Sequence, residues 1–366
     1  MGKTMHLVIN ATELGRQRGG NETYIAGLLA GLTDLNPAVQ LSLLTCQWPV
    51  AAPLPPLFRQ MNLGVYQRFP FLLWQQTLAL RQLKADWYLA NFFLPPLLPC
   101  RGVVMVHDLS FRAHPEYFPR SVSWYMRWLT GLAVQQAERV LTVSEFSRQE
   151  LCRFYPVEPA KVTVVPNGVG AEFQPASPTT IASDQAALAR YGLEPPYILA
   201  LGNIHPRKNL ARLLQAYHCL KQQLPHVPPL VWAGLPRWES SALLTEAHAA
   251  GVILPGFIAQ ADLPALYRQA TMLVYPSLYE GFGLPPLEAM ACGTPVVTSS
   301  TTSLPEVVGE AGLTVDPTRI EAITAAMARL LTDPALAHHL RQAGLERAAG
   351  FSWQQAAQNT LACLVS

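Results

Sequence analysis

The 366-residue chain lacks the cysteine pairs that mark zinc and redox motifs: its six cysteines are scattered, and none belongs to a C-x-x-C pair. Such scattered cysteines are typical of buried free thiols in a reducing compartment. The chain also has no D-x-D motif, and its His, Cys and Asp residues have no metal-ligand spacing. We therefore expect no metal site and no bound cofactor.

Long hydrophobic runs and charge are also scarce. No apolar run reaches the ~18 residues of a membrane span, and Met5–Asn10 is too short for a signal peptide. We expect a cytoplasmic protein, with a peripheral position on the inner membrane face as the alternative. A net charge of +2 gives no case for nucleic-acid binding. Residues 1–180 carry net +4 and the rest −2, which either reflects chance or favours an anionic partner for the first half.

Half of the residues are apolar, and short apolar runs alternate with amphipathic helical patterns. This alternation predicts two doubly wound, Rossmann-like α/β domains, residues 1–175 and 195–350, joined by a linker with a short helix (Ala171–Leu193) and followed by a final helix over residues 351–366. The expected strands are Met5–Asn10, Leu41–Thr45, Trp87–Ala90, Gly102–His107, Arg139–Val143 and Val162–Val165, then Tyr197–Leu201, Leu230–Ala233, Val252–Leu254, Met272–Tyr275, Pro295–Thr298 and Leu313–Val315.

The segment Gly281–Leu287 lies between two glutamates, Glu280 in the loop and Glu288 about two turns into an expected helix. Glycines at a helix N-terminus present backbone N–H groups that bind anions. Carboxylates accept hydrogen bonds from sugar and ribose hydroxyls. The segment therefore predicts a nucleotide-sugar site, with the diphosphate on the amides of Gly281, Phe282, Gly283 and Leu284 and the hydroxyls on the two glutamates.

These residues carry a resemblance to a known family. Glu280, seven residues, Glu288 and then Ala289–Val297 resemble the donor-site signature of the retaining glycosyltransferases of family 4, which have the GT-B fold. Other segments agree from about Gly19 to about Trp353: Val143–Ser147, Val165–Val169, Gly202–Asn209, Pro276–Gly283 and Ser303–Val307. The subgroup nearest in appearance is the bacterial mannosyltransferases of polysaccharide assembly, which share His107–Ser110 and Pro115–Pro119.

The resemblance implies a GT-B fold with two Rossmann-like domains facing a central cleft, and a final helix that crosses back to the first domain. It implies a retaining, metal-independent hexosyltransferase that moves mannose from GDP-mannose to a saccharide or lipid-linked saccharide acceptor. A UDP-sugar-dependent glucosyl-type transferase and a nucleotide-sugar epimerase on the same fold are the alternatives. A non-catalytic binding protein is disfavoured, because binding alone needs no charge-stabilising pair at a diphosphate.

Arg207 and Lys208 follow the expected strand Tyr197–Leu201, after Gly202 and Asn203. Cations at this edge suit a diphosphate and stabilise its growing charge as it leaves. A solvated helix start is the alternative, but cations at a helix N-terminus oppose the dipole. By the resemblance, Gly202 and Asn203 belong to the phosphate-binding segment, Glu280 lies near the donor sugar and Glu288 accepts from the ribose.

The first domain offers Gly19, Gly20 and His107. Two glycines before the expected helix Asn21–Leu32 allow close approach of a ligand, although a plain tight turn explains them as well. His107 ends an expected strand, and a lone histidine is more often structural. By the resemblance, the glycines lie beside the diphosphate and acceptor, and His107 contacts sugar hydroxyls or acts as a general base.

Two aromatic segments remain, Phe69–Leu80 and Trp124–Leu129. Core packing is their usual explanation. An acceptor groove or a membrane-surface contact is the alternative.

Overall fold

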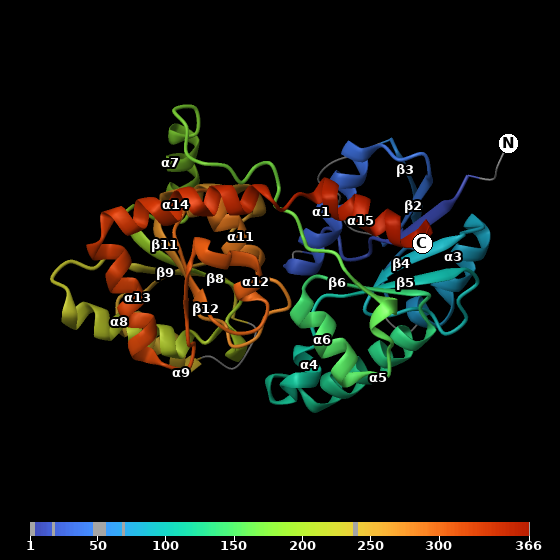
Figure 1. Cartoon of the computed structure of the whole chain (residues 1–366), viewed down its shortest axis with the longest axis horizontal. Coiled ribbons are helices and arrows are strands. Elements are labelled where there is room, and N and C mark those ends of the chain that lie inside the picture. Colours follow the sequence, from blue (N-terminus) through green and yellow to red (C-terminus); the bar gives the residue numbers. More distant parts are fainter. Residues whose placement is uncertain (1–3, 17–18, 47–55, 68–69, 237–240, 366) are drawn as a thin grey trace. The chain divides into compact units, whose positions relative to one another are not determined.

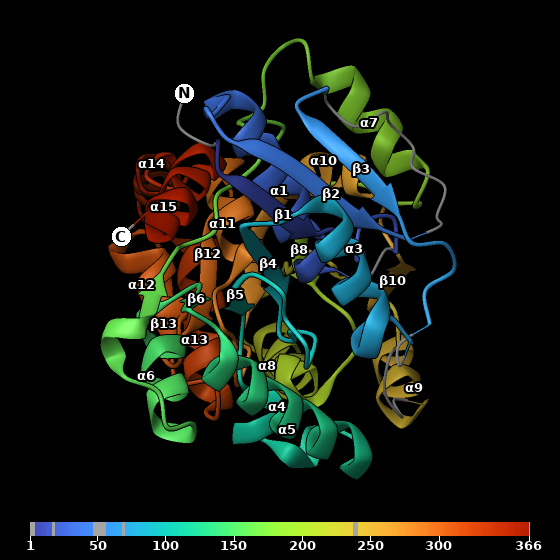
Figure 2. The ribbon, with the colours of Figure 1, turned by 90° about the vertical axis from the view of Figure 1, so that its right-hand side faces the viewer.

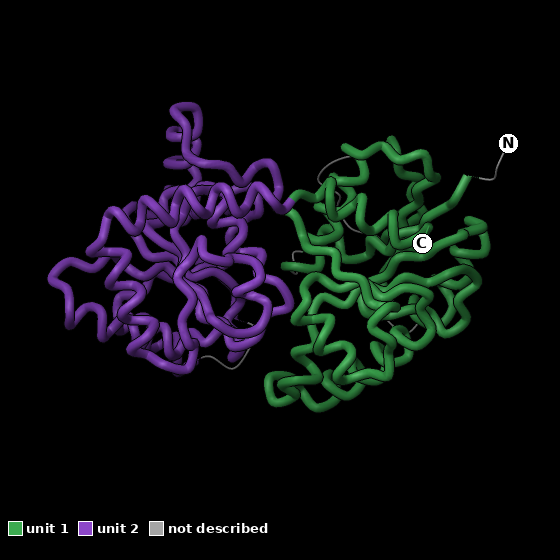
Figure 3. The backbone as a smooth tube through the Cα atoms, viewed as in Figure 1, with its two compact units in different colours: residues 1–168, 352–366 green, residues 169–351 purple. Residues whose placement is uncertain are grey.

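The structure is a computed structural model that describes residues 4–16, 19–46, 56–67, 70–236 and 241–365. The chain forms two compact units: unit 1 contains residues 1–168 and 352–366, and unit 2 contains residues 169–351 (Figure 3). Each unit is built on one parallel sheet, with helices on both of its faces (Figures 1 and 2). The two Rossmann-like sheets confirm the predicted fold class.

Unit 1 contains a seven-stranded sheet in the order β3-β2-β1-β4-β5-β6-β7. Its strands are β1 (His6–Asn10), β2 (Gln40–Thr45), β3 (Phe58–Asn62), β4 (Trp87–Asn91), β5 (Arg101–Val106), β6 (Arg139–Thr142) and β7 (Val162–Val164). The chain order reverses between β1 and β4. Ligands of doubly wound sheets bind at such a point, beyond the carboxyl ends of the strands.

The helical elements of unit 1 are α1 (Gly20–Leu35), the π-helical turn η1 (Phe71–Gln75), α3 (Gln76–Leu83), α4 (Ser110–Ala113), η2 (Pro115–Tyr117), α5 (Arg120–Gln136), α6 (Glu145–Phe154), η3 (Pro159–Lys161) and α15 (Trp353–Val365). Helices α3, α5 and α6 pack on one face of the sheet, because buried side chains of all three join the strands in a single core cluster.

Helix α15 packs on α1 through two glycines. A Cβ built on Gly27 would lie 2.0 Å from the indole of Trp353, and one on Gly31 would lie 2.1 Å from the carbonyl oxygen of Trp353. The ring of Tyr24 meets the same indole edge-on, with 6.2 Å between centroids. Because Gly27 and Gly31 have no side chains, α1 leaves a space that Trp353 at the start of α15 fills; we call this space the seat.

Unit 2 contains a six-stranded sheet in the order β10-β9-β8-β11-β12-β13, which reverses between β8 and β11. Its strands are β8 (Tyr197–Leu201), β9 (Leu230–Ala233), β10 (Ile253–Gly256), β11 (Ala270–Tyr275), β12 (Val296–Ser299) and β13 (Leu313–Val315). These strands are short, almost continuously apolar and mostly buried, which is typical of parallel strands covered on both faces.

The helical elements of unit 2 are α7 (Ile181–Ala189), η4 (Pro206–Lys208), α8 (Leu210–Gln223), α9 (Ser241–Ala249), η5 (Gln260–Asp262), α10 (Leu263–Gln269), α11 (Leu284–Ala291), α12 (Leu304–Val308), η6 (Gly309–Ala311), α13 (Ile320–Thr332) and α14 (Pro334–Ala349). Helix α7 is the short helix expected in the linker. It is fastened to α10 by the buried ion pair between Arg268 and Asp184, with NH2 and Oδ1 2.5 Å apart.

Three details depart from the sequence-based expectation or complete it. Strand β3 was not predicted, because only Phe58 of its five residues is buried. None of the six cysteines, all within the described residues, forms a disulfide, as predicted, but only Cys46, Cys292 and Cys363 are buried. None of the helices in the described ranges is both long and apolar enough to cross a bilayer.

Core packing is the wrong explanation for much of the two aromatic segments. Trp74 and Leu78 of the first segment are exposed, and so are Trp124 and Trp128 of the second. Phe69, at the start of the first segment, lies outside the described residues.

Candidate active site

The residues predicted to bind a diphosphate lie where the strand order of unit 2 reverses. Residues 202–208 follow β8, and residues 276–283 follow the neighbouring strand β11. Two loops that are about 70 residues apart in the chain therefore leave the sheet side by side, and the amide of Leu278 donates to the carbonyl of Arg207 (2.7 Å). This is the edge at which doubly wound sheets bind ligands.

A buried cluster forms around Glu280. Lys208 Nζ donates to Glu280 Oε1 (2.6 Å), and Arg207 NH1 donates to Glu280 Oε2 (2.7 Å). The hydroxyl of Tyr275 also donates to Oε1 (3.0 Å) and accepts a hydrogen bond from Lys208 Nζ. Glu280 thus holds both cations at the edge of the sheet, and the three side chains together carry one net positive charge.

The electrostatics keep Glu280 ionised. Burial alone would raise the pKa of its carboxyl, but the charges of Arg207 and Lys208 outweigh burial and lower that pKa to about 2. Breaking a buried pair by removing one partner is strongly destabilising. An anion that binds here can instead share the two cations with Glu280, so the cluster suits a ligand that brings both phosphate oxygens and hydroxyl groups.

The backbone around Arg207 and Lys208 is held by Asn209, which adopts a left-handed conformation (φ 59°). Its Nδ2 donates to the carbonyls of Pro276 (3.0 Å) and Pro317 (2.6 Å). The two cations therefore lie in the 3-10 turn η4, before α8 begins. They do not occupy the solvated helix start that was the alternative, and Lys208 is buried.

Gly202 and Gly234 allow the loops after β8 and β9 to pack closely. A Cβ on Gly202 would lie 3.1 Å from Cε of Lys208, and one on Gly234 would lie 2.0 Å from the carbonyl oxygen of Gly202. Both have a positive φ that favours glycine (132° and 150°). Asn203 has a structural contact, since its Oδ1 accepts from the amide of Leu235 (3.2 Å).

The glycine loop after Glu280 is fixed by Ser303, whose hydroxyl contacts the carbonyls of Glu280 (2.9 Å) and Phe282 (2.7 Å). Gly283 caps α11 with φ 129°, and a Cβ there would lie 2.8 Å from Leu304. Pro285 and Pro286 carry no N–H. The first turn of α11 therefore offers fewer donors than the sequence pattern suggested, and an anion would depend on the amides of residues 281–284.

Glu288 lies one turn into α11, not two, because the helix begins at Leu284. The hydroxyl of Tyr267 donates to Glu288 Oε2 (2.7 Å). Burial raises the pKa of Glu288 to about 7, although the hydrogen bond from Tyr267 opposes the rise. Within the described residues the Glu288 carboxyl forms no ion pair, so it makes a site separate from the Glu280 cluster.

In unit 1, Gly19 and Gly20 lie at the start of α1, just beyond residues 17–18, which the structure does not describe. Gly19 has φ 88° and precedes the helix, and Gly20 is its first residue. Among the described residues, no atom beyond the chain neighbours and the helix's own backbone lies within 4 Å of a Cβ built on either glycine. Internal packing therefore does not require glycine at position 20, and the exposed glycines keep the N-terminus of α1 accessible.

His107 follows β5 directly and is enclosed by aromatic rings. Its ring centroid lies 4.6 Å from that of Tyr24 and 5.7 Å from that of Phe92. Burial lowers the pKa of His107 to about 4, against the opposing charge of Asp108, so the imidazole is neutral at physiological pH. Asp108 itself accepts hydrogen bonds from the amide (2.9 Å) and the hydroxyl (2.7 Å) of Ser110, the first residue of α4.

Three buried polar atoms in this region of unit 1 have no hydrogen-bond partner within the described ranges: His107 Nε2, the Tyr24 hydroxyl and Asn91 Oδ1. Buried polar atoms are normally paired, because an unmade hydrogen bond costs free energy. Asn91 ends β4, next to β5 and His107. The carboxyl edge of the unit 1 sheet therefore presents hydrogen-bonding capacity for a polar ligand.

The structure brings Arg207, Lys208 and Glu280 together and places Glu288 in a second cluster of the same unit. Sequence reasoning missed four residues that build these clusters: Tyr267, Tyr275, Asn209 and Ser303. A signal existed for the last two, since both belong to segments typical of the family. In the part of the chain that the structure describes, no three His, Cys, Asp or Glu side chains group as metal ligands.

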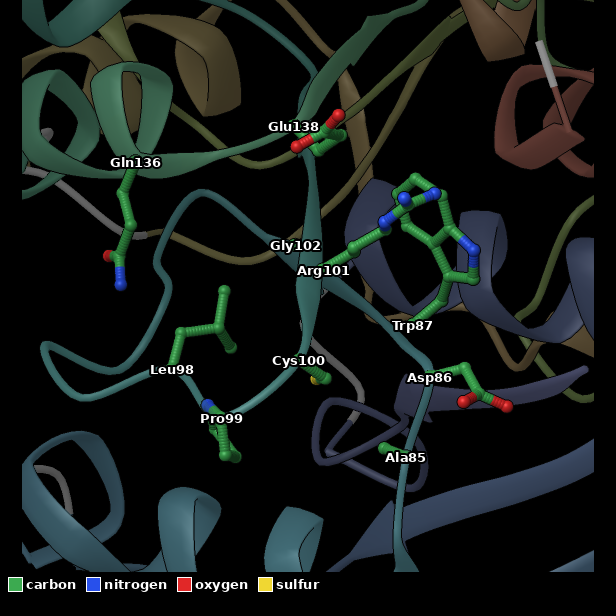
Figure 4. A pocket seen from close by; sticks show the side chains of 10 residues that line it. All are labelled: Ala85, Asp86, Trp87, Leu98, Pro99, Cys100, Arg101, Gly102, Gln136 and Glu138. Carbon is green, nitrogen blue, oxygen red and sulfur yellow. The ribbon is translucent and has the colours of Figure 1, made fainter.

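A hollow of about 720 Å³ in unit 1 lies away from these residues (Figure 4). It is lined by residues at the opposite ends of the strands, such as Asp86 before β4, Arg101 at the start of β5 and Glu138 before β6. The Arg101 guanidinium lies 5.3 Å from the ring centroid of Trp87. Because ligands of doubly wound sheets bind at the carboxyl edge, size alone does not make this hollow the active site.

Comparison with known proteins identifies the family. The model of Glycosyltransferase Family 4 matches residues 18–173, and that of Glycosyl transferases group 1 matches residues 187–347. O-antigen chain mannosyltransferase B of Escherichia coli is 39% identical over 293 residues, which cover 78% of this chain and 76% of that protein. Serotype-specific mannosyltransferase WbdA of Escherichia coli is 33% identical over 269 residues, which cover 71% of this chain and 33% of that protein.

Solved structures share the fold across the whole chain. Sucrose-phosphate synthase from Thermosynechococcus elongatus superposes with a TM-score of 0.78 at 21% identity, covering 99% of this chain and 98% of that chain. HepE of Anabaena in complex with UDP-glucose gives 0.74 at 17% identity, covering 99% of both chains. The sequence matches, the paired parallel sheets and these neighbours agree: the chain belongs to glycosyltransferase family 4 and is a glycosyltransferase of GT-B fold.

Proposed function

We propose that this glycosyltransferase transfers mannose from GDP-mannose to a saccharide or lipid-linked saccharide, with retention of configuration and without a divalent cation. The observation that carries the proposal is the buried cluster in which Glu280 holds Arg207 and Lys208 at the switch point of unit 2. Mannose is favoured because the relatives that are 39% and 33% identical are named as mannosyltransferases.

Arg207 and Lys208 stabilise the departing diphosphate. Charge on the leaving group grows as the bond to the sugar breaks, so fixed cations lower the energy of the transition state more than that of the bound donor. They are already oriented by Glu280, so no reorganisation is needed at the moment of reaction. The same two charges replace the divalent cation that other sugar transferases use.

Glu280 and Glu288 accept hydrogen bonds from hydroxyl groups of the donor. Glu280 stays ionised, with its pKa near 2, and accepts from the donor sugar while it keeps the cations in place. Glu288 accepts from the ribose, and Tyr267 orients its carboxyl. In a retaining front-face reaction the departing phosphate oxygen takes the proton of the acceptor hydroxyl, which explains why neither carboxylate need act as a nucleophile.

In unit 1 we assign His107 and Tyr24 to hydrogen bonds with sugar hydroxyls, through the atoms that have no internal partner in the described structure. The low pKa of His107 (about 4) favours this role over general-base catalysis, because so weak a base takes up a proton poorly near neutral pH. Gly20 is assigned to close approach of the donor diphosphate or the acceptor.

The test is a donor panel of GDP-mannose, UDP-glucose and ADP-glucose, with release of the nucleoside diphosphate followed with and without a mannose-containing acceptor. We expect acceptor-dependent release from GDP-mannose alone, and an α-linked product by NMR. Release from UDP-glucose instead would assign the enzyme to glucosyl-type transfer. Conversion of the sugar without acceptor-dependent release would show an epimerase and overturn the proposal, and a β-linked product would overturn retention.

A further inference from the structure

We propose that unit 1 docks on an anionic lipid bilayer through the face formed by α3, α5 and the β4–β5 loop, which goes beyond the proposed function and does not depend on it. Seven of the eleven large apolar side chains that are exposed in the described residues lie on these three elements or on the turn η1 that leads into α3, with exposed fractions of 43–68%. They are Leu73, Trp74, Leu78, Leu97, Trp124, Trp128 and Leu132. We call this set the apolar face.

The apolar face is continuous because the β4–β5 loop, residues 92–100, is bonded to both helices. Thr77 Oγ1 on α3 donates to the carbonyl of Leu97 (2.9 Å), and Gln136 Nε2 at the end of α5 donates to that of Pro95 (3.1 Å). Trp74 and Leu78 are within one turn of Thr77, and Leu132 is one turn before Gln136. The exposed side chains therefore follow one another from α3 across the loop to α5.

Helices α3 and α5 lie on the same side of the unit 1 sheet. Ala79 and Leu80 of α3 belong to the same buried cluster as Ala133 and Val134 of α5, so the opposite sides of the helices form the surface. Trp124, Trp128 and Leu132 are spaced four residues apart along α5, and the two indoles are nearly parallel, at 9°. Indole rings are favoured at the boundary between lipid headgroups and acyl chains.

The charge of the segments that form the apolar face indicates which partner binds there. Residues 70–84, 92–100 and 120–136 contain four cations, Arg81, Lys84, Arg120 and Arg127, and no Asp or Glu. Each cation close to an anionic bilayer adds to the attraction. The carboxylates of Asp86 and Glu138 lie just outside these segments, in the hollow of Figure 4, which the end of the β4–β5 loop (Leu98, Pro99, Cys100) and Gln136 also line.

A second copy of the chain is a poorer partner. A two-fold dimer would place the same patch against itself and would bring the four cations of each copy together without any carboxylate of these segments between them. Like charges facing each other across an interface oppose association. Apolar indoles with surrounding cations match a lipid surface, where the rings enter the interface and the cations meet phosphate groups.

The experiment is co-sedimentation of the full chain with vesicles of phosphatidylcholine, with and without phosphatidylglycerol. We expect binding that is at least tenfold tighter with phosphatidylglycerol and that weakens as salt is added. The double variant Trp124→Ser, Trp128→Ser should bind at least tenfold more weakly, because two large apolar side chains no longer leave water. Ile181→Ser on α7 is the matched control: it also removes an exposed apolar side chain, and binding should not change.

A second double variant, Arg81→Gln with Arg120→Gln, separates charge from apolar contact. It should lose most of the preference for phosphatidylglycerol and keep the weaker binding to phosphatidylcholine. Absence of vesicle binding by the unmodified chain, or equal binding by the tryptophan variant, would overturn the proposal. So would self-association in lipid-free sedimentation that the tryptophan variant abolishes, because a second copy would then cover the face. Nucleoside diphosphate release with a water-soluble acceptor should be the same in all variants, which shows that they are folded.

Discussion

Replacing Glu288 with glutamine should remove a pH dependence that the buried carboxyl imposes on the folded protein. Glutamine keeps the shape of the side chain and an oxygen that can accept from Tyr267, but it cannot ionise. In the unmodified protein, burial raises the pKa of Glu288 from its ordinary 4.5 to about 7. The phenol of Tyr267 has a pKa well above 10 for the same reason and stays protonated.

The direction in which stability changes with pH follows from which state, folded or unfolded, binds the proton of Glu288. Between about pH 4.5 and pH 7 the folded chain still holds the proton of Glu288, whereas the unfolded chain has released it. The unfolded state thus binds fewer protons, and stability falls as pH rises through this window. Above pH 7 the loss is constant, and the size of the pKa rise makes it roughly 3 kcal/mol.

The assay is urea denaturation of both proteins, without nucleotide, between pH 5 and pH 8. The free energy of unfolding of Glu288→Gln minus that of the unmodified chain should increase by roughly 3 kcal/mol across this range. Any constant cost of burying the amide appears at every pH and cancels in the comparison. Parallel curves for the two proteins would refute the inference that burial dominates the ionisation of Glu288.

Nucleotide binding provides a second measurement of the ionisation of Glu288. A ribose that donates hydrogen bonds to Glu288 favours the ionised form, so GDP affinity of the unmodified protein should rise from pH 5 to pH 7, by up to about tenfold per pH unit. Titration of the diphosphate itself affects both proteins equally, which makes Glu288→Gln the control. If the variant kept the full affinity and the same pH profile in calorimetry, the ribose assignment would be wrong.

Three further predictions concern the reaction. Lys208→Met should lower kcat by about a hundredfold while donor affinity changes less, because the cation acts mainly on the leaving group; steady-state kinetics that showed only a higher KM would contradict this. Turnover should persist in excess EDTA, and loss of activity that magnesium or manganese restores would reveal a required metal. Gly20→Ala should keep the melting temperature, since its Cβ meets no atom of the described residues, and should lower turnover at least tenfold if a ligand approaches there. Gly31→Ala should instead unfold at lower temperature, because its Cβ would lie 2.1 Å from Trp353. Normal turnover in Gly20→Ala would exclude close approach of a ligand at Gly20.

The fold could be predicted from the sequence because buried parallel strands appear in it as short apolar runs. Strand β8, with Ile198, Leu199 and Ala200 all buried, is recognisable in this way. Strand β3 is not, because an edge strand with one buried residue leaves no run to detect. The aromatic content of α5 was misleading for the opposite reason: apolar character predicts burial, but Trp124 and Trp128 face outward.

The site residues could be proposed from motifs, but their contacts could not. Glu280 lies 72 residues from Lys208 and meets it only because β8 and β11 are neighbours in the sheet. The hydrogen bond between Tyr267 and Glu288 likewise depends on the packing of α10 and α11. The spacing within a motif reflects local geometry. These two contacts instead depend on which elements, far apart in the sequence, become neighbours in the fold.

The seat that Gly27 and Gly31 form for Trp353 has a consequence for the order of events during synthesis. Unit 2 is a continuous stretch, residues 169–351, whereas unit 1 needs residues from both sides of it. A ribosome that has made all of unit 2 has not yet released the helix that fills the seat on α1. The nascent first unit therefore keeps two glycines in the middle of a helix without the packing that compensates for their low helix propensity. We expect unit 2 to reach its final state first and the first-made residues to complete their fold last.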